Sequence, residues 1–142
     1  NCHVMRTNRY ALGQALGQAI EIEGHTDLAI DGVKFSGNAQ RRRRDALLFH
    51  GTILLGFDLP LIGQALRIPS SEPDYREGRS HETFCRNIPL TPEVVKQALG
   101  QSWLCGGQAP PIDAGNVQRL AGEKYSRPDW IHRRAKRSQA SE

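Results

Sequence analysis

Two polar patterns in the middle of the sequence carry the residue types that could do chemistry. In the first, every second side chain of an alternating segment is polar, and these side chains are Lys34, Ser36, Asn38 and Gln40. In the second, an apolar segment is interrupted only by His50 and Thr52. Because successive side chains of a strand point to opposite faces, each set would share one face. An ammonium beside hydroxyl and amide donors suits the charged oxygens of a phosphate or carboxylate.

The two segments can pair as an antiparallel hairpin if the arginine run 41–44 forms the connection. Under that hypothesis Lys34 lies opposite Thr52 and Ser36 lies opposite His50, so that cation, hydroxyls and imidazole share one surface. The second segment is predicted to be an interior strand, because it is almost wholly apolar. The alternative interpretation is a solvated lysine and a structural histidine, which are common roles of these residues on strands.

Turn and capping signals predict the elements around these segments. Asp31-Gly32 is a hairpin-turn signal, so residues 28–30 and 33–39 should form a tight hairpin. Residues 84–90 are predicted to be another short strand. Apolar periodicity and capping residues predict helices over residues 8–20, 61–66, 91–103 and 113–125.

Composition and charge are typical of a folded domain. The chain has 142 residues, of which 38% are hydrophobic and 24% charged, and this length suits one domain. The net charge of +4 comes largely from residues 41–44 and 133–137, but no aromatic platform accompanies them, so we expect no nucleic-acid partner. No apolar stretch is long enough to span a bilayer. Cys2, Cys85 and Cys105 lack metal-ligand spacing, which indicates reduced thiols in a cytoplasmic protein.

Three blocks of sequence together resemble one protein family. They read Thr26-Asp27-Leu28, then Gly32 to Gln40, then His50-Gly51-Thr52-Ile53-Leu54-Leu55. In this order and separation they resemble the lipoate-protein ligase A branch of the biotin/lipoate ligase and octanoyltransferase family. The resemblance implies an α/β (α+β) fold with a mixed, largely antiparallel sheet flanked by helices. It predicts a partial catalytic domain over residues 1–132 and a basic polar tail over residues 133–142.

The resemblance also implies roles for individual residues. Lys34 matches the family lysine that contacts the acyl carbonyl and phosphate oxygens of an acyl-adenylate. Asp27 matches an acidic residue at the nucleotide end and is a candidate Mg²⁺ ligand. The remaining predicted contacts to substrate or nucleotide lie on the two polar segments and are Ser36, Gly37, Asn38, Ala39, Gln40, His50, Gly51 and Thr52.

The activity implied by the resemblance is ligation of lipoate or octanoate to protein. ATP with Mg²⁺ would activate lipoate to lipoyl-adenylate, and a lysine of a carrier domain would then take the lipoyl group. The carrier would be a dehydrogenase E2 domain or the glycine cleavage H protein. The alternative enzyme is an octanoyl or lipoyl transferase that works through a cysteine thioester. Neither Cys85 nor Cys105 matches a transferase nucleophile in sequence, although Arg86 could favour a Cys85 thiolate.

Family members also carry an earlier Arg-Arg, a Gly-Gly-Gly stretch and a His, and residues 1–20 contain no match to them. Together with the missing initiator Met, this predicts a fragment, half of a two-chain enzyme whose partner supplies the N-terminal half, or an inactive remnant that only binds acyl-nucleotide or carrier. The charged segment 74–81 also resembles ligase-like members. Its Arg76, Arg79 and His81 would close over the ligand or meet the carrier, but the stronger expectation is a solvated connector.

Overall fold

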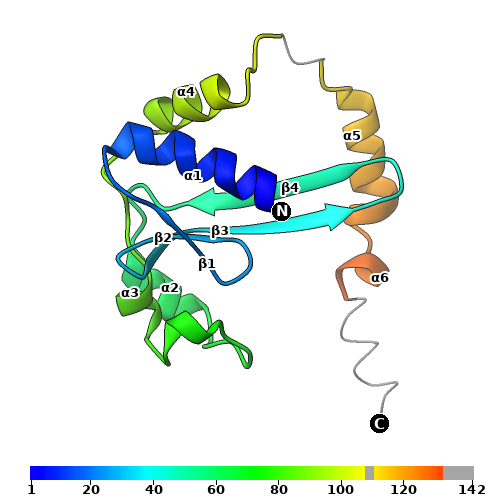
Figure 1. Cartoon of the computed structure of the whole chain (residues 1–142). Coiled ribbons are helices and arrows are strands. Elements are labelled where there is room, and N and C mark those ends of the chain that lie inside the picture. Colours follow the sequence, from blue (N-terminus) through cyan, green and yellow to red (C-terminus); the bar gives the residue numbers. More distant parts are fainter. Residues whose placement is uncertain (108–110, 133–142) are drawn as a thin grey trace. The chain divides into compact units, whose positions relative to one another are not determined.

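A four-stranded antiparallel sheet organises the first part of the chain, with the strands in the order β1-β2-β3-β4. The computed structural model describes residues 1–107 and 111–132. Two helices, α1 (Cys2–Leu16) and α4 (Pro92–Ser102), lie on one side of the sheet, and two others, α2 (Leu59–Ala65) and α3 (His81–Phe84), lie on the other (Figure 1). This arrangement confirms the predicted antiparallel sheet flanked by helices. The strand bounds are β1 Glu21–Glu23, β2 Asp27–Ile30, β3 Val33–Arg42 and β4 Leu47–Ile53.

The hairpin between β2 and β3 confirms the predicted turn. Asp31 and Gly32 have φ angles of 52° and 69°, and this left-handed pair matches the twist of the flanking strands. The predicted helix over residues 8–20 is displaced, because α1 covers Cys2–Leu16. Gly17 ends it in the left-handed conformation, with φ 67°. The segment after Gly17 then forms β1, a strand that the sequence analysis did not predict.

The hydrophobic core lies between the sheet and the pair of helices α1 and α4. Helix α4 covers Pro92–Ser102, and the side chain of Thr91 caps it by accepting from the backbone N–H of Val94, as its sequence predicts. Burial of each large core side chain contributes about 1.5–3 kcal/mol. The core cluster comprises Met5, Leu12, Ile20, Leu28, Ile30, Phe35, Ile88 and Val95.

Two apolar residues of the α4 segment remain partly exposed. Val94 and Trp103 are 39% and 37% exposed. The Trp103 Nε1 donates to Asn8 Oδ1 of α1 at 2.8 Å. The segment therefore contributes Val95 to the core and uses Trp103 to tie α4 to α1.

The register of β3 against β4 differs from the predicted one by three residues. Gly37 lies opposite Thr52 and Ala39 lies opposite His50. The difference arises because β3 continues through Arg42 and the turn closes later, with Arg43 donating its backbone N–H to the Ala46 carbonyl at 2.8 Å. An odd shift in register moves every side chain to the other face relative to its partner strand.

Strand β4 is an edge strand, so the prediction of an interior strand is wrong. The order of the sheet leaves β4 paired with β3 alone. Leu47 and Leu48 are 51% and 59% exposed. Apolar composition predicted burial on both faces, but this sheet does not extend beyond β4 within the described residues.

A β-bulge in β3 reverses the expected grouping of the polar side chains. Leu28 pairs with Ser36, whereas the next residue of β2, Ala29, pairs with Lys34. Phe35 is therefore the extra residue, and the alternation of faces restarts after it. Lys34 consequently shares a face with Gly37, while Ser36 and Asn38 lie on the other face. The predicted common face of Lys34, Ser36, Asn38 and Gln40 is wrong.

The segment after β4 covers the second face of the sheet with short helices. They are α2 Leu59–Ala65, the 3-10 turn η1 Asp74–Arg76 and α3 His81–Phe84. The predicted α2 is confirmed. The predicted strand over residues 84–90 is reduced to an isolated bridge, in which Cys85 pairs with Lys34 in parallel orientation.

The chain divides into two units, Asn1–Gly106 and the residues from Gly107 onward. The second unit contains α5 Ala114–Leu120, the π-helical turn η2 Ala121–Tyr125 and α6 Pro128–Ile131. Asp113 caps α5 by accepting from the Asn116 N–H at 2.9 Å, as predicted. The predicted tail over residues 133–142 lies outside the described residues, and the predicted boundary at residue 132 stays a prediction. Every described helix is too short or too polar to cross a lipid bilayer.

Candidate functional site

The centre of the site is an ion pair on the face of the sheet that α2 and α3 cover. Lys34 Nζ lies 2.8 Å from Asp27 Oδ1, and their side chains are 27% and 14% exposed. The Tyr75 hydroxyl donates to Asp27 Oδ2 at 2.7 Å. Burial and the hydrogen bond to Asp27 raise the pKa of Tyr75 well above its ordinary value, so its hydroxyl stays a donor. Asp27 therefore uses one oxygen to hold the ammonium and the other to accept from the phenol.

Gly37 makes room for this ion pair. It lies opposite Asp27 in the pairing of β2 with β3, so both residues share the face of Lys34. A Cβ atom at Gly37 would lie 2.9 Å from both Cε and Nζ of Lys34. The lysine side chain thus runs across a strip of bare backbone, which is a function of glycine in strands.

A cavity of about 270 Å³ adjoins Lys34. Its polar residues are Lys34, Thr52, Arg76, His81 and Cys85; Ser36 also borders it, although its Oγ accepts from Asn38 on the other face. Its apolar wall includes Leu54, Ile62, Leu66 and Phe84, from the end of β4, from α2 and from α3. No carboxylate borders it among the described residues. The cavity combines an apolar wall with positive charge, which suits an apolar ligand that has an anionic end.

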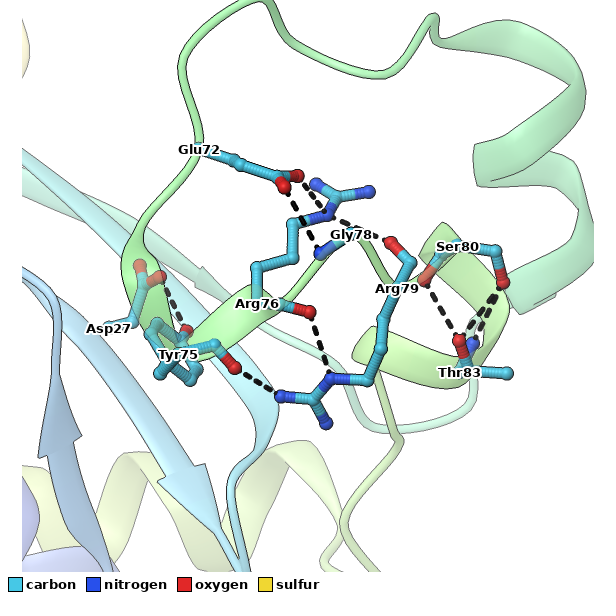
Figure 2. Close-up of polar contacts among 8 residues, drawn as sticks. All are labelled: Asp27, Glu72, Tyr75, Arg76, Gly78, Arg79, Ser80 and Thr83. Atoms are coloured by element: carbon cyan, nitrogen blue, oxygen red, sulfur yellow. Dashed lines mark hydrogen bonds and ion pairs between the residues drawn. The ribbon is translucent and has the colours of Figure 1, made fainter.

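The segment that closes this cavity is held by two reciprocal arginines (Figure 2). Arg76 Nε donates to the Arg79 carbonyl, and Arg79 Nε donates to the Arg76 carbonyl, each at 3.0 Å. Arg79 Nη2 also donates to the carbonyls of Tyr75 and Gly32, which ties the segment to the β2–β3 turn. Arg76 is only 4% exposed. The prediction of a solvated connector is therefore wrong for this part of the segment, because it is a hydrogen-bonded wall.

Several predicted contact residues lie away from the cavity. Asn38 belongs to the opposite face, where its Nδ2 donates to Ser36 Oγ at 3.1 Å and to the Thr26 carbonyl at 2.8 Å. Gly51 gives Asn38 the space it needs, because a Cβ there would collide with the amide of Asn38. His50 is exposed on β4. Neither these residues nor Ala39 and Gln40 border the cavity, and their roles in ligand binding stay predictions.

Cys85 borders the cavity beside Lys34, which the sequence did not indicate. The two residues form the isolated parallel bridge, and the Arg86 N–H donates to the Lys34 carbonyl at 2.8 Å. Burial raises the pKa of the Cys85 thiol, and this outweighs the opposing effects of Lys34 and Arg76. No local sequence signal near Cys85 indicates this position, because the bridge between Cys85 and Lys34 forms only where the chain returns to β3.

The donor set around Asp27 does not favour a metal ion. Both carboxylate oxygens already accept from Lys34 and Tyr75. The described residues contain no group of three or more His, Cys, Asp or Glu side chains that could hold a metal. Asp27 as a Mg²⁺ ligand stays a prediction, and the geometry assigns this carboxylate to Lys34.

A second hollow, of about 680 Å³, is lined by residues of α1 and of the segment that follows it, between Arg9 and Ile20. It has a larger volume than the Lys34 cavity, but it is lined mainly by glycine, glutamine and apolar residues. It has no thiol, carboxylate or imidazole on its wall. The cavity beside Lys34 is therefore the better candidate for chemistry.

Comparison with known proteins gives the family. The model of the lipoyl protein ligase A/B catalytic domain matches residues 9–101. Octanoyltransferase LipM of Symbiobacterium thermophilum is 42% identical over 76% of this chain and 44% of its own length. Lipoate--protein ligase 1 of Staphylococcus aureus is 26% identical over 85% of this chain and 40% of its own length. The chain thus spans about two fifths of the length of these relatives.

Solved structures give the same fold. Ta0514 of T. acidophilum, a candidate lipoate protein ligase, superposes with a TM-score of 0.65 at 18% identity, over 90% of this chain and 57% of its own. Its structure with bound lipoic acid gives a TM-score of 0.64, also at 18% identity, over 91% of this chain and 58% of its own. On the match of the family model and the shared fold, the chain belongs to the lipoyl protein ligase A/B catalytic domain family.

Proposed function

We propose that this chain provides the lysine-bearing part of a lipoate-protein ligase site. ATP and a medium-chain carboxylic acid, lipoate or octanoate, would be the substrates, and a lysine of a carrier domain would be the acceptor. The observation that carries the proposal is the Lys34 ammonium, held 2.8 Å from Asp27 beside a cavity with an apolar wall and no bordering carboxylate.

In the first step, a carboxylate oxygen of lipoate would attack the α-phosphate of ATP, and pyrophosphate would leave. In the second, the amine of the carrier lysine would attack the acyl carbon, and AMP would leave with the electrons of the broken C–O bond. Negative charge grows on the phosphoryl oxygens in the first step and on the acyl oxygen in the second. Lys34 would stabilise both by donating to these oxygens, while Asp27 keeps the ammonium in place.

Several findings support this assignment. The relatives include Lipoate--protein ligase 1 of Staphylococcus aureus, and the fold matches that of Ta0514 with bound lipoic acid. Leu54, Ile62 and Leu66 offer a wall for a saturated chain next to the ammonium. The Mg²⁺ that accompanies ATP would be held through the phosphates and groups beyond Asp27, and we assign no step to it.

The test is a mass measurement on the acceptor. The purified chain is incubated with lipoate, ATP and a lipoyl-accepting E2 domain or H protein, and we expect a gain of one lipoyl group that requires ATP. Lys34→Ala should abolish the gain. Lys96→Ala, which removes an exposed lysine of α4, is the matched control and should retain it. An acceptor whose mass stays unchanged with the unaltered chain would contradict catalysis by this polypeptide.

A second candidate, an acyl transferase that works through a thioester, is favoured by the position of Cys85. Its thiol borders the same cavity as Lys34, and Octanoyltransferase LipM of Symbiobacterium thermophilum is among the relatives. The sulfur would attack the carbonyl carbon of an acyl thioester and release the donor thiol, and the acceptor amine would then displace Cys85. Burial keeps this thiol protonated, so the first step needs a base to take its proton.

The two candidates differ in donor and in the need for sulfur. A transferase would acylate the acceptor from an octanoyl carrier protein without ATP, and Cys85→Ala would stop it. A ligase would tolerate Cys85→Ala, because no protein nucleophile takes part in acyl-adenylate chemistry. An ATP-dependent increase in acceptor mass that persists in Cys85→Ala therefore supports the ligase. An increase that needs no ATP and is lost in Cys85→Ala supports the transferase.

A further inference from the structure

Two residues near Lys34 each have a side-chain nitrogen atom that is buried without a hydrogen-bond partner among the described residues. These atoms are Arg76 Nη2 and His81 Nε2. Both residues border the cavity. Buried polar atoms are nearly always hydrogen-bonded, so two such atoms on one wall require an explanation.

The rest of the Arg76 guanidinium is fixed in place. Its Nε donates to the Arg79 carbonyl at 3.0 Å and lies 3.3 Å from Glu72 Oε2. Its Cζ lies 4.8 Å from the centre of the Phe84 ring, which supports it by a cation–π contact. Glu72 is engaged elsewhere as well, because its Oε1 accepts from the Gly78 N–H at 3.1 Å. These contacts hold the guanidinium at its Nε edge and leave Nη2 unused (Figure 2).

The positive groups of this region gather around one aromatic ring. Lys34 Nζ lies 5.9 Å from the centre of the Phe84 ring, and Arg79 Cζ lies 5.3 Å from it. The donors of Arg79 bind backbone carbonyls, and Lys34 forms an ion pair with Asp27. Arg76 is the cation of this group that is buried and retains a donor atom without a partner. A guanidinium in this situation binds carboxylate or phosphate oxygens strongly.

We propose that Arg76, assisted by His81, forms an oxyanion-binding subsite at the cationic end of the Lys34 cavity. The ligand is a medium-chain acyl compound whose carbonyl carbon carries a charged group, either a free carboxylate or the phosphoryl group of an acyl-adenylate. Its hydrocarbon chain lies along the wall of Leu54, Ile62 and Leu66. This inference rests on the proposed function and deepens it by naming how the site selects the state of the acyl substrate.

The subsite also discriminates between the two candidate reactions. A carboxylic acid and an acyl-adenylate both carry negative charge next to the acyl carbon, whereas an acyl thioester carries none there. Glu72 meets the guanidinium only at Nε and Nη2 has no partner among the described residues, so Nη2 can still donate to a charged group of the ligand, and the cavity prefers charged acyl ligands to neutral ones. The structure thus favours a substrate that enters as a free acid over one that enters as a thioester.

Calorimetric titration of the unaltered chain tests the preference directly. Octanoate and octanamide have the same chain and differ in charge, and we expect octanoate to bind at least about tenfold more tightly, the value of one hydrogen bond to a charged group. Equal affinities, or no binding of either compound, would overturn the proposal. Titrations with inorganic phosphate and with a non-hydrolysable octanoyl-sulfamoyl adenosine then show which charged group the subsite binds. A higher affinity for the adenosine compound than for octanoate indicates a phosphoryl site, and a lower affinity indicates a carboxylate site.

Arg76→Gln identifies the residue responsible. The variant should lose about tenfold or more in affinity for octanoate while its affinity for octanamide changes little. Arg43→Gln removes the same charge from the exposed β3–β4 turn and should alter neither affinity. Because Arg76 also supports Phe84, His81→Gln provides a second variant with a smaller structural change, and it should weaken octanoate binding selectively. Equal losses for octanoate and octanamide in both variants would show that the two residues only support the wall.

The proposed function and this inference fail separately. If the chain prefers octanoate to octanamide in a way that depends on Arg76, but the carrier gains no mass, the subsite is supported and ligation by this chain is refuted. ATP-dependent ligation with unchanged affinities in both variants would retain the ligase and refute the subsite.

Discussion

Replacing Gly37 with Ala should damage the chemistry of Lys34 without unfolding the sheet. The added Cβ would lie 2.9 Å from Cε and from Nζ of Lys34, and 3.7 Å from Asp27 Oδ1. Gly37 is not among the residues with positive φ, so alanine fits its backbone conformation. The conflict falls on the end of a flexible side chain, which can move away at small cost to folding.

The size of the displacement follows from these distances. Non-bonded carbon atoms prefer a separation of about 3.5–4.0 Å, so the lysine must move by about 0.5–1 Å. A shift of that size breaks or lengthens the contact of 2.8 Å with Asp27. Misplacement of a catalytic group by about 1 Å can cost about a hundredfold in rate, so we expect a loss of that order for Gly37→Ala.

Two measurements detect the effect of Gly37→Ala on Lys34. The first is the rate of lipoyl transfer to the carrier domain, and the second is acylation of Lys34 by an activated acetate ester, read by peptide mass spectrometry. Release from Asp27 should raise the labelling of Lys34 by about fivefold, the equivalent of an ion pair of about 1 kcal/mol. Gly56→Ala is the matched control, because a Cβ there would meet no atom within 4 Å.

The proposed role of Gly37 is refuted if Gly37→Ala keeps both the transfer rate and the labelling of Lys34 at the level of Gly56→Ala. A collapse of the thermal transition in Gly37→Ala would also refute it, since the steric conflict would then fall on the fold and not on the lysine. The expected pattern is a nearly unchanged melting temperature with altered lysine chemistry.

Three further outcomes are expected. Lys34→Ala should abolish transfer at a cost of about 1–2 kcal/mol in unfolding free energy, because one half-buried ion pair is lost; denaturant unfolding that shows a much larger cost would assign the lysine to stability. Because burial raises the pKa of Cys85, its thiolate forms at higher pH, so iodoacetamide should label it more slowly than exposed Cys2 and Cys105 at neutral pH; equal rates across a pH series would contradict this. Phe35→Ala should cost about 3–5 kcal/mol by chemical denaturation, because the ring is fully buried, and a loss below about 1 kcal/mol would show that the core can refill the space.

Local signals in the sequence determined much of the framework. Asp31-Gly32 predicted the β2–β3 hairpin, because few residue pairs adopt two successive left-handed conformations. Thr91 and Asp113 predicted the starts of α4 and α5, because a side-chain oxygen at these positions satisfies a free backbone N–H. Such signals involve residues close together in the chain, and their physical basis is therefore visible in the sequence. Lys34 could be singled out in the same way, by its place on a polar strand and by its family resemblance.

The tertiary structure decided which groups Lys34 meets. The bulge at Phe35 separates Lys34 from the face of Ser36 and Asn38, and a rule of strict alternation cannot reveal one extra residue. Cys85 and Arg76 reach the cavity only because the chain returns across the second face of the sheet and forms a bridge with Lys34. Burial and long-range contact then set the pKa of Cys85 and leave Arg76 Nη2 without a partner. These properties depend on what packs around each group, so they exist only in the folded chain.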